Sequence, residues 1–328
     1  MQEIPDRNLG LDLARVTETA AMAAARWQGR GDKEAADQAA VDGMRAHLGT
    51  LNLDGVVVIG EGEKDEAPML HNGEKVGNGN GQQVDVAVDP VDGTTLTANG
   101  MPGALAVLAV AERGAMFSPA SLVYMDKIAV GPLAAGMIDL EAPVDRNLRR
   151  VAKAKGEDIN DLTVIILDRP RNERFIKEVR AAGARIRLIG DGDVSAAIAT
   201  ARDNSGIDML LGIGGSPEGV LAAAALRCMG GEIQARLWAR DESEVEYAAE
   251  HGFDLERVME TDELVGGTNV SFAATGVTDG EFLRGVEFHA DGAVTHSVMM
   301  RSKTGSIRYM DAYHDLRTLR KVSSVDYD

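Results

Sequence analysis

Apolar residues recur at every third or fourth position near the start of the chain, in two series separated by Gly29-Arg-Gly31. The first series is Leu9, Leu13, Val16, Ala20, Ala24 and Trp27, and the second is Ala36, Ala40, Met44 and Leu48. This period predicts two amphipathic helices, the second of which has Asp32 as its N-terminal cap. Asp37 lies one position from the second apolar stripe, so we expect its carboxylate at the edge of the buried face.

A second pattern covers residues 84–89, where valine alternates with aspartate or alanine. This period of two predicts a half-buried strand. Pro90 follows, and proline has no backbone N–H to donate to a neighbouring strand. We therefore expect the strand to end at Asp89, with its carboxylate at the last position of the ladder.

The residues after Pro90 complete a candidate metal site. Asp92 is expected in the turn, and Gly93 frees the backbone to fold back and bring Thr94 beside both carboxylates. Two carboxylates and a hydroxyl at a strand end suit Mg²⁺ or Mn²⁺, with positions left open for water and phosphate oxygens. The alternative is an Asp-rich turn that only ends a strand.

From about residue 141 the chain shows short apolar runs, each followed by a polar turn and a helical period. The runs are 162–167, 184–189 and 209–213, and their turns are 168–171, 190–193 and 214–219. This alternation predicts a mostly parallel sheet whose turns share the edge at which such sheets bind ligands. In the last turn Ser216 suits a helix cap and Pro217 the first helical position, so backbone N–H groups there could hold an anion. The alternative is a plain capped helix, and the two arginines of the turn 168–171 favour the anion.

Shorter apolar runs predict the remaining strands and divide the chain into two halves. Apolar runs at 56–59, 104–111 and 125–130 predict strands of an N-terminal α+β half, residues 1–140, which would carry the metal site. Segments 297–301 and 306–310 predict a hairpin around Lys303-Thr-Gly305, within a C-terminal α/β half, residues 141–328. No linker rich in Pro, Gly or Ser separates the halves, so we expect them to pack as one layered α/β unit.

Composition narrows the function classes. A net charge of −18 over 328 residues argues against a nucleic-acid partner, and no apolar run approaches the roughly 18 residues of a membrane span. Residues 1–6 do not show a basic region followed by an apolar one, so we do not expect a secreted protein. Cys228 is the single cysteine and lies in a helical pattern, so we expect a buried structural thiol and a cytoplasmic protein. No two histidines have the spacing of metal ligands. Covalent catalysis is not expected, because no serine or cysteine has an obvious base nearby in the sequence.

Five motifs together resemble a known family. They are Asp89-Pro-Val-Asp-Gly-Thr94, Gly29-Arg-Gly-Asp-Lys33 with Asp37, Gly60-Glu-Gly-Glu-Lys-Asp-Glu-Ala-Pro-Met69, Gly190-Asp-Gly-Asp-Val194 and Gly212-Ile-Gly-Gly-Ser-Pro-Glu-Gly219. The first resembles the signature of the lithium-sensitive, metal-dependent phosphatases, and in this order all five resemble the class II fructose-1,6-bisphosphatases of bacteria. Asp92 stands where many of those enzymes have Glu, which keeps the ligand type and shortens its reach. The resemblance implies a layered αβαβα sandwich of the sugar and inositol phosphatase type.

The resemblance also implies roles for individual residues. The metal ligands would be Asp37 and Glu61 for one ion and Asp89, Asp92 and Glu218 for another. The catalytic residues would be Thr94, backed by Asp65, to orient the attacking water, and Lys33 near the reacting phosphate, although Lys33 also reads as a surface lysine. The substrate-binding residues would be Asp92, Gly93, Thr94, Tyr124, Arg169, Pro170, Arg171, Asp191, Gly192, Asp193 and Gly215. In this set the arginines suit the distant phosphate and the aspartates suit sugar hydroxyls.

The implied activity is hydrolysis of fructose 1,6-bisphosphate to fructose 6-phosphate in gluconeogenesis, by a homo-oligomer (dimer or tetramer) with two or more Mn²⁺ or Mg²⁺ ions per site. The alternatives are an enzyme that also takes sedoheptulose 1,7-bisphosphate, a broader sugar or inositol phosphatase, and a non-catalytic sugar-phosphate sensor. The pair Arg169 and Arg171 favours a bisphosphate, because a monophosphatase has no use for a second clamp. The full set of acids with Thr94 favours an enzyme over a sensor.

Overall fold

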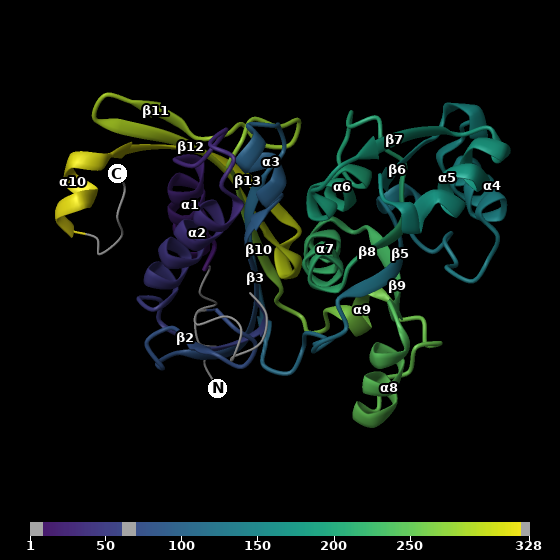
Figure 1. Ribbon diagram of the computed structural model, residues 1–328, viewed down its shortest axis with the longest axis horizontal. Helices are drawn as coiled ribbons and strands as arrows, with labels where there is room; N and C mark the ends of the chain where they lie inside the picture. The colour runs from purple at the N-terminus through teal and green to yellow at the C-terminus, as the bar shows by residue number, and fades with distance from the viewer. Residues whose placement is uncertain (1–8, 61–69, 323–328) are drawn as a thin grey trace.

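The computed structural model describes residues 9–60 and 70–322, which form five alternating layers of helices and sheets (Figure 1). From one side to the other, the three helical layers contain α1 (Gly10–Ala25) and α2 (Lys33–Leu48), then α6 (Asp193–Thr200) and α7 (Ser216–Met229), then α4 (Val144–Lys155) and α5 (Glu173–Ala182). A sheet lies in each of the two gaps between these layers. The αβαβα sandwich implied by the resemblance is confirmed.

The first sheet has eight strands in the order β11-β12-β10-β4-β3-β1-β2, with β13 paired to β12. Its strands are β1 (Leu53–Ile59), β2 (Lys75–Val76), β3 (Gln82–Asp92), β4 (Leu105–Glu112), β10 (Ser271–Gly276), β11 (Glu287–His289), β12 (Gly292–Arg301) and β13 (Ser306–Asp315). The predicted hairpin is β12 and β13, in which Arg301 pairs with Ser306.

The second sheet has five strands in the order β7-β6-β8-β5-β9. They are β5 (Tyr124–Val130), β6 (Thr163–Leu167), β7 (Arg185–Ile189), β8 (Met209–Gly215) and β9 (Glu232–Trp238). Strand β6 is parallel to β7 and β8, while β5 is antiparallel to both β8 and β9. Four of the five strands therefore run in one direction, which confirms the mostly parallel sheet.

Sheet membership does not follow the order of the chain. Strand β5, which we expected to belong with the N-terminal half, lies in the second sheet, whereas β10, β12 and β13 lie in the first. The chain therefore does not change sheets at residue 140. The reason is that tertiary packing selects the partner of each strand, and periodicity along the chain carries no information about it.

The remaining elements are short. They are helices α3 (Thr94–Asn99), α8 (Glu242–His251), α9 (Thr261–Leu264) and α10 (Leu316–Val322), and the 3₁₀ turns η1 (Pro132–Ala134), η2 (Ile159–Asp161), η3 (Pro170–Asn172) and η4 (Ser302–Thr304). Over residues 9–60 and 70–322, no helix is both long and apolar enough to cross a membrane.

Three local predictions are confirmed. The Asp32 side chain caps α2 by accepting the Ala35 N–H at 3.0 Å. Asp37 is half-buried on that helix, as its place beside the apolar stripe predicted. Cys228 is 4% exposed, its thiol donates to the Val270 carbonyl at 3.6 Å, and burial raises the pKa of the thiol to about 12, so it is a structural residue.

Strand β3 is more deeply buried than predicted. It lies between β1 and β4 near the middle of the first sheet, and Val84 to Val88 are all buried. Asp85, which the alternation placed on an exposed face, is 2% exposed, accepts the Met116 N–H at 3.1 Å and lies 3.5 Å from Arg113. The half-buried strand was a wrong prediction, because an aspartate with internal partners mimics a solvent-facing one in the sequence.

The end of β3 also differs from the prediction. The strand does not stop at Asp89 but continues through Pro90 to Asp92, so Asp92 lies in the strand and not in the turn. Its pairing with β4 shifts register between Asp89 and Asp92. The missing N–H of Pro90 falls within this irregularity, where no regular ladder bond is lost.

Candidate functional site

The carboxyl ends of β6, β7 and β8 share one edge of the second sheet, because these strands are parallel. The side chain of Asn172, which is fully buried, ties two of these ends together. Its Nδ2 donates to the carbonyls of Leu167 and Ile213, each at 3.1 Å, and its Oδ1 accepts the Ile213 N–H at 2.7 Å. A Cβ atom at Gly212 would lie 2.8 Å from that Oδ1. The predicted turn 168–171 is thereby fixed against the end of β8.

Arg171 is held from two directions in this turn. Its Nε donates to the Ile213 carbonyl at 3.0 Å, and its guanidinium carbon lies 4.3 Å from the centre of the Tyr124 ring. Arg240 approaches the same ring at 5.8 Å. The two terminal nitrogens of Arg171 have no partner in the part of the chain that the structure describes. With Arg169 half-buried nearby, the turn presents a fixed donor group of the kind that binds phosphate.

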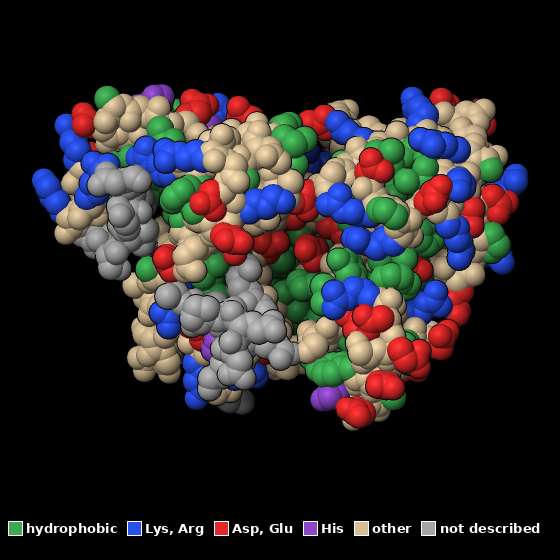
Figure 2. All heavy atoms as spheres, in the orientation of Figure 1, with side chains coloured by type: hydrophobic (Ala, Val, Ile, Leu, Met, Phe, Trp, Pro, Cys, Tyr) green, Lys and Arg blue, Asp and Glu red, His purple; other side chains and the backbone are tan. Residues whose placement is uncertain are grey.

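Four acidic residues from different layers lie within electrostatic reach of one another. Asp92 ends β3, Asp191 and Asp193 follow β7, and Glu218 lies in the first turn of α7. Asp92 is 3% exposed. Burial, followed by the nearby charge of Glu218 and then those of the two other aspartates, raises the pKa of Asp92 well above its usual value. Figure 2 shows acidic side chains gathered in the recess between the two halves of the molecule.

Two buried oxygens of this cluster, Asp92 Oδ2 and Glu218 Oε2, have no hydrogen-bond partner among the described residues. Burial raises the pKa of Glu218, which Lys127 opposes and Asp193 reinforces. A buried carboxylate oxygen without a donor is unfavourable. Both oxygens are therefore suited to a ligand that brings positive charge.

Asp191 lies within electrostatic reach of two predicted site residues that belong to different parts of the fold. Burial raises the pKa of Asp191, whereas the Gly192 N–H, 3.3 Å from its Oδ1, and the positive charges of Arg169 and Lys33 act in the opposite direction. Lys33 begins α2 beside the first sheet, and Arg169 follows β6 in the second. The structure therefore brings Lys33 and Arg169 to one carboxylate.

Lys127 is a candidate that the sequence analysis missed. It lies on β5, is 2% exposed, and its Nζ donates to Asp193 Oδ2 at 2.5 Å and to the Gly215 carbonyl at 2.9 Å. The sequence did contain one indication that this side chain is buried, namely its position in the strand alternation. Lys127 alternates with Met125 and Ala129, which are both buried, so its side chain shares their face.

The turn between β8 and α7 has room for these side chains only because it is rich in glycine. A Cβ atom at Gly214 would lie 1.9 Å from Asp193 Oδ2, and one at Gly215 would lie 1.8 Å from Glu218 Oε2. These contacts are far shorter than any tolerated carbon–oxygen distance. The glycines are therefore required by the acids that lie against them.

The start of α7 corrects one prediction. The helix begins at Ser216, with Gly215 as its cap and Pro217 at the second helical position. The Ser216 N–H donates to the Val123 carbonyl at 2.8 Å, so it is not free to hold an anion. The predicted serine cap was wrong because β8 continues in extended conformation through Gly215.

The other predicted residues of the first sheet lie close in sequence to Asp92. Asp89 is half-buried and its Oδ1 accepts the Val91 N–H at 3.0 Å. Gly93 takes a φ of 103°, a value that strains any other residue, and α3 begins directly after it at Thr94. Asp37, by contrast, lies on helix α2 and far from Asp92 in sequence, and burial raises the pKa of its carboxyl group.

Some predicted residues add little to the geometry. Glu61 and Asp65 lie outside the described residues. Pro170 begins η3 and is exposed, and Gly192 precedes α6 with a φ of 90°. No three Asp, Glu, His or Cys side chains within residues 9–60 and 70–322 meet closely enough to hold a metal ion by themselves. The described acids by themselves therefore do not make a complete metal site.

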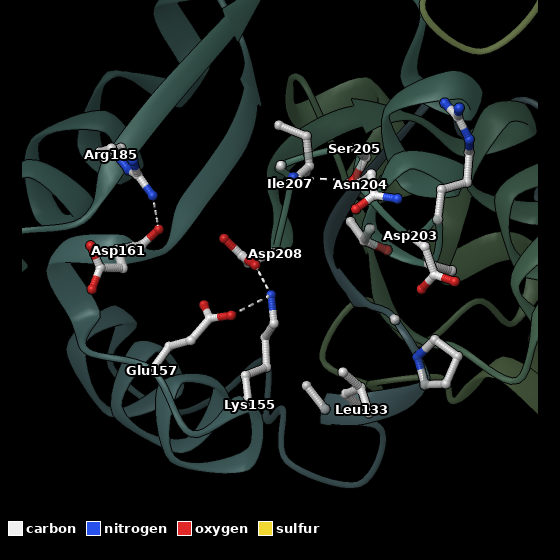
Figure 3. A pocket seen from close by; sticks show the side chains of 17 residues that line it. Leu133, Lys155, Glu157, Asp161, Arg185, Asp203, Asn204, Ser205, Ile207 and Asp208 are labelled. Carbon is white, nitrogen blue, oxygen red and sulfur yellow. Dashed lines mark hydrogen bonds and ion pairs between the residues drawn. The ribbon is translucent and has the colours of Figure 1, made fainter.

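A separate cavity of about 460 Å³ lies at the opposite edge of the second sheet, where β5 ends and β6 and β8 begin (Figure 3). Lys155 pairs there with Asp208 and, at 3.5 Å, with Glu157, and Arg185 donates to the Asp161 carbonyl. Lys155, Glu157, Arg185 and Asp208 have partners within the protein there, and no residue of the predicted site lines this cavity. The acidic cluster therefore remains the candidate active site.

Comparison with known proteins identifies the family of the chain. A family model described as "Bacterial fructose-1,6-bisphosphatase, glpX-encoded" matches residues 7–314. The chain is 43% identical to the fructose-1,6-bisphosphatase class 2 of Haemophilus influenzae over 98% of its own length and all of that protein. It is 45% identical to the fructose-1,6-bisphosphatase 1 class 2 of Escherichia coli K12 over 94% of its own length and 96% of that protein.

Proposed function

This chain belongs to the family of bacterial, glpX-encoded fructose-1,6-bisphosphatases, and from that premise we propose that it hydrolyses fructose 1,6-bisphosphate to fructose 6-phosphate and phosphate, a step of gluconeogenesis. The observation that supports this most directly is the meeting of Asp92 with Asp191, Asp193 and Glu218. Acids from both sheets face one another beside a turn that carries two arginines. Such a site can bind metal at one end and a phosphate at the other.

Divalent cations, Mn²⁺ or Mg²⁺, are part of this proposal. The buried oxygens of Asp92 and Glu218 that lack a donor fit such an ion, because hard cations take carboxylate oxygens as ligands. Asp89 would complete this set, and Asp37 would hold a second ion with Glu61. When bound, the ions would neutralise phosphoryl oxygens and lower the pKa of a bound water, in a reaction whose uncatalysed rate is among the slowest known.

Thr94 is proposed to orient the attacking water through its hydroxyl. Two features of the backbone support this role: Thr94 is separated from Asp92 by one residue, and the left-handed Gly93 turns the chain between them. A hydroxyl can accept a hydrogen bond from water while it donates to a carboxylate, and we propose Asp65 as that carboxylate. Lys33 is proposed to meet the reacting phosphate, in keeping with its position near Asp191.

The phosphate that does not react is proposed to bind Arg169 and Arg171. Arg171 supports this role because its Nε bond and its contact with Tyr124 already fix the guanidinium plane. A pre-ordered arginine loses little side-chain entropy when it binds an anion. Asp191 and Asp193, whose carboxylates can accept from hydroxyls, are proposed to bind the sugar between the two phosphates, beside Gly215.

We also propose a cytoplasmic homo-oligomer, either a dimer or a tetramer. Strand β13 supports the assembly into an oligomer, because it spans ten residues and pairs with β12 alone within the described ranges. Tyr309 and Tyr313 on this strand are 58% and 83% exposed. An open edge strand with exposed aromatic residues is a suitable surface for a second copy of the chain. Light scattering of the parent and of Tyr313→Lys measures whether this strand contributes to assembly.

Phosphate release from a panel of sugar phosphates tests the activity. Fructose 1,6-bisphosphate, sedoheptulose 1,7-bisphosphate, fructose 1-phosphate and inositol 1-phosphate are each supplied with Mn²⁺, with Mg²⁺ or with chelator. We expect metal-dependent release with preference for the bisphosphates. Binding of fructose 1,6-bisphosphate without release under every metal condition would indicate a sensor instead, and equal release from all four substrates would indicate a broad phosphatase.

A further inference from the structure

We infer that Lys127 is a positioning residue: its ammonium group holds Asp193 and the turn between β8 and α7 in the geometry that receives the sugar phosphate. This inference rests on the proposed function, in which Asp193 and Gly215 face the substrate. Lys127 would act through these two residues and not through contact with the reacting atoms.

Lys127 contacts two segments that are separated from each other in the sequence. Its Nζ donates to Asp193 Oδ2, at the start of α6, and to the Gly215 carbonyl, at the end of β8. Its own backbone is fixed in the sheet, where Lys127 pairs with Gly212 on β8 and with Ala235 on β9. One ammonium group on an interior strand of the second sheet therefore sets the position of the α6 turn relative to the α7 turn.

The surrounding glycines show that the fold is built around this side chain. A Cβ atom at Gly214 would lie 2.8 Å from the Nζ of Lys127, and one at Gly219 would lie 3.2 Å from its Cδ. The same Gly214 carbon would collide with Asp193 Oδ2 at 1.9 Å. The glycine-rich motif that resembles an anion-binding turn thus also makes the space for a buried Lys127–Asp193 pair.

The Lys127–Asp193 pair also balances charge within the acidic cluster. Asp193 is 7% exposed and contributes to the raised pKa values of Asp92, Asp191 and Glu218, so these four acids repel one another. Without Lys127 the Asp193 carboxylate would be a buried charge among like charges, and we expect it to turn away from its present position. Breaking one side of a buried pair is unfavourable in this way, and buried pairs are retained where they fix one arrangement.

The central test is Lys127→Met, which keeps the length of the side chain and removes its charge. At saturating Mn²⁺ we expect the KM for fructose 1,6-bisphosphate to rise at least tenfold while kcat changes less than threefold, because a displaced Asp193 weakens binding of the sugar throughout the reaction. Calorimetric binding of fructose 6-phosphate to the metal-free protein should weaken by a similar factor. An unchanged KM together with unchanged fructose 6-phosphate affinity would overturn the inference.

Lys155→Met is the matched control. Lys155 also pairs with a buried aspartate, Asp208, in the same half of the molecule, but at the opposite edge of the sheet (Figure 3). We expect it to lower the Tm and leave KM unchanged. If Lys127→Met lowers the Tm and shifts KM no more than Lys155→Met does, Lys127 has a structural role alone.

A double-mutant cycle tests whether Lys127 acts through Asp193. The variant Lys127→Met with Asp193→Asn should bind no more weakly than Asp193→Asn alone, since the group that Lys127 positions is already gone. Because it has no unpaired buried charge, this variant also carries the test if Lys127→Met does not fold. Full additivity of the two effects would overturn the inference. A parent protein that releases no phosphate from fructose 1,6-bisphosphate would count against the proposed function, while fructose 6-phosphate binding still tests Lys127.

Discussion

Glu18 is a buried carboxylate whose replacement by glutamine should stabilise the protein at alkaline pH. It lies on α1, is 3% exposed, and has an Oε1 without a hydrogen-bond partner in the described part of the chain. Burial raises the pKa of Glu18 from 4.5 to about 7, against the lowering effects of Arg15 and of hydrogen bonds from Ser297 and Thr295 on β12. The ionised side chain is therefore a source of instability at neutral and higher pH.

The sign and size of the effect follow from linkage. A carboxyl group whose pKa is raised by folding contributes stability that is complete below 4.5, its value in the unfolded chain, and is lost as the pH rises through about 7. The loss amounts to roughly 3 kcal/mol, since each pKa unit corresponds to about 1.4 kcal/mol. Glutamine is neutral at every pH, so Glu18→Gln should exceed the parent in unfolding free energy by about 1–3 kcal/mol at pH 8 and by less than ~1 kcal/mol at pH 5.

Urea unfolding of parent and variant at pH 5, 6, 7 and 8, followed by circular dichroism with chelator present, measures this difference. His47 and His314 lie in the same region, and burial lowers the pKa of each, but both titrate in parent and variant alike and cancel in the comparison. Since α1 covers the outer face of the first sheet, kcat should stay within twofold of the parent (Figure 1). A free-energy difference that is constant from pH 5 to pH 8 would refute the reasoning.

Three changes at the active site have distinct expected signatures. Asp89→Asn removes a proposed metal ligand and should lower kcat at least ~10²-fold with the fold retained by circular dichroism; near-normal turnover at saturating Mn²⁺ would remove Asp89 from the metal site. Thr94→Ala should lower kcat with little change in metal or substrate affinity, and loss of metal binding by calorimetry would make Thr94 a ligand instead. Fructose 1,6-bisphosphate should exceed fructose 1-phosphate at least tenfold in kcat/KM, because each charge-assisted hydrogen bond to the second phosphate contributes ~1.5–3 kcal/mol, and Arg171→Ala should remove most of that gap by raising KM. A collapse of kcat at constant KM would place Arg171 in the chemistry.

The elements of the fold were predictable where a local pattern carries them. Helix α2 follows from one apolar stripe and the Asp32 cap, and the alternation after residue 141 predicted β6, β7 and β8 with their turns at one edge. The partners of β5 were not predictable in this way. Its run of apolar residues is the same whether it joins the first sheet or the second, and only packing against β8 and β9 decides between them.

The difference between local patterns and tertiary packing also explains which site residues could be predicted from the sequence. The pattern predicted the turns at strand ends that contain Asp191, Arg169 and Glu218, because polar residues there stand out against the apolar run before them, and the family resemblance assigned the individual roles. Lys127 is inside a strand, and its importance depends on Asp193, which comes 66 positions later. Nothing local to β5 specifies that an aspartate from α6 will meet this lysine. Only its phase with the buried Met125 indicated an internal partner.

The glycines of the turn after β8 show why a correct motif can still be explained by the wrong interaction. Glycine next to a helix start is read as room for a ligand to approach backbone N–H groups, and that reading predicted an anion at Ser216. In the structure the Ser216 N–H is bonded to Val123, and the space at Gly214 and Gly215 is filled by the carboxylates of Asp193 and Glu218. A sequence records that a side chain is absent but not what occupies the space it leaves. The location of a glycine-rich site can therefore be inferred from sequence, whereas its charge has to be read from the side chains that fold against it.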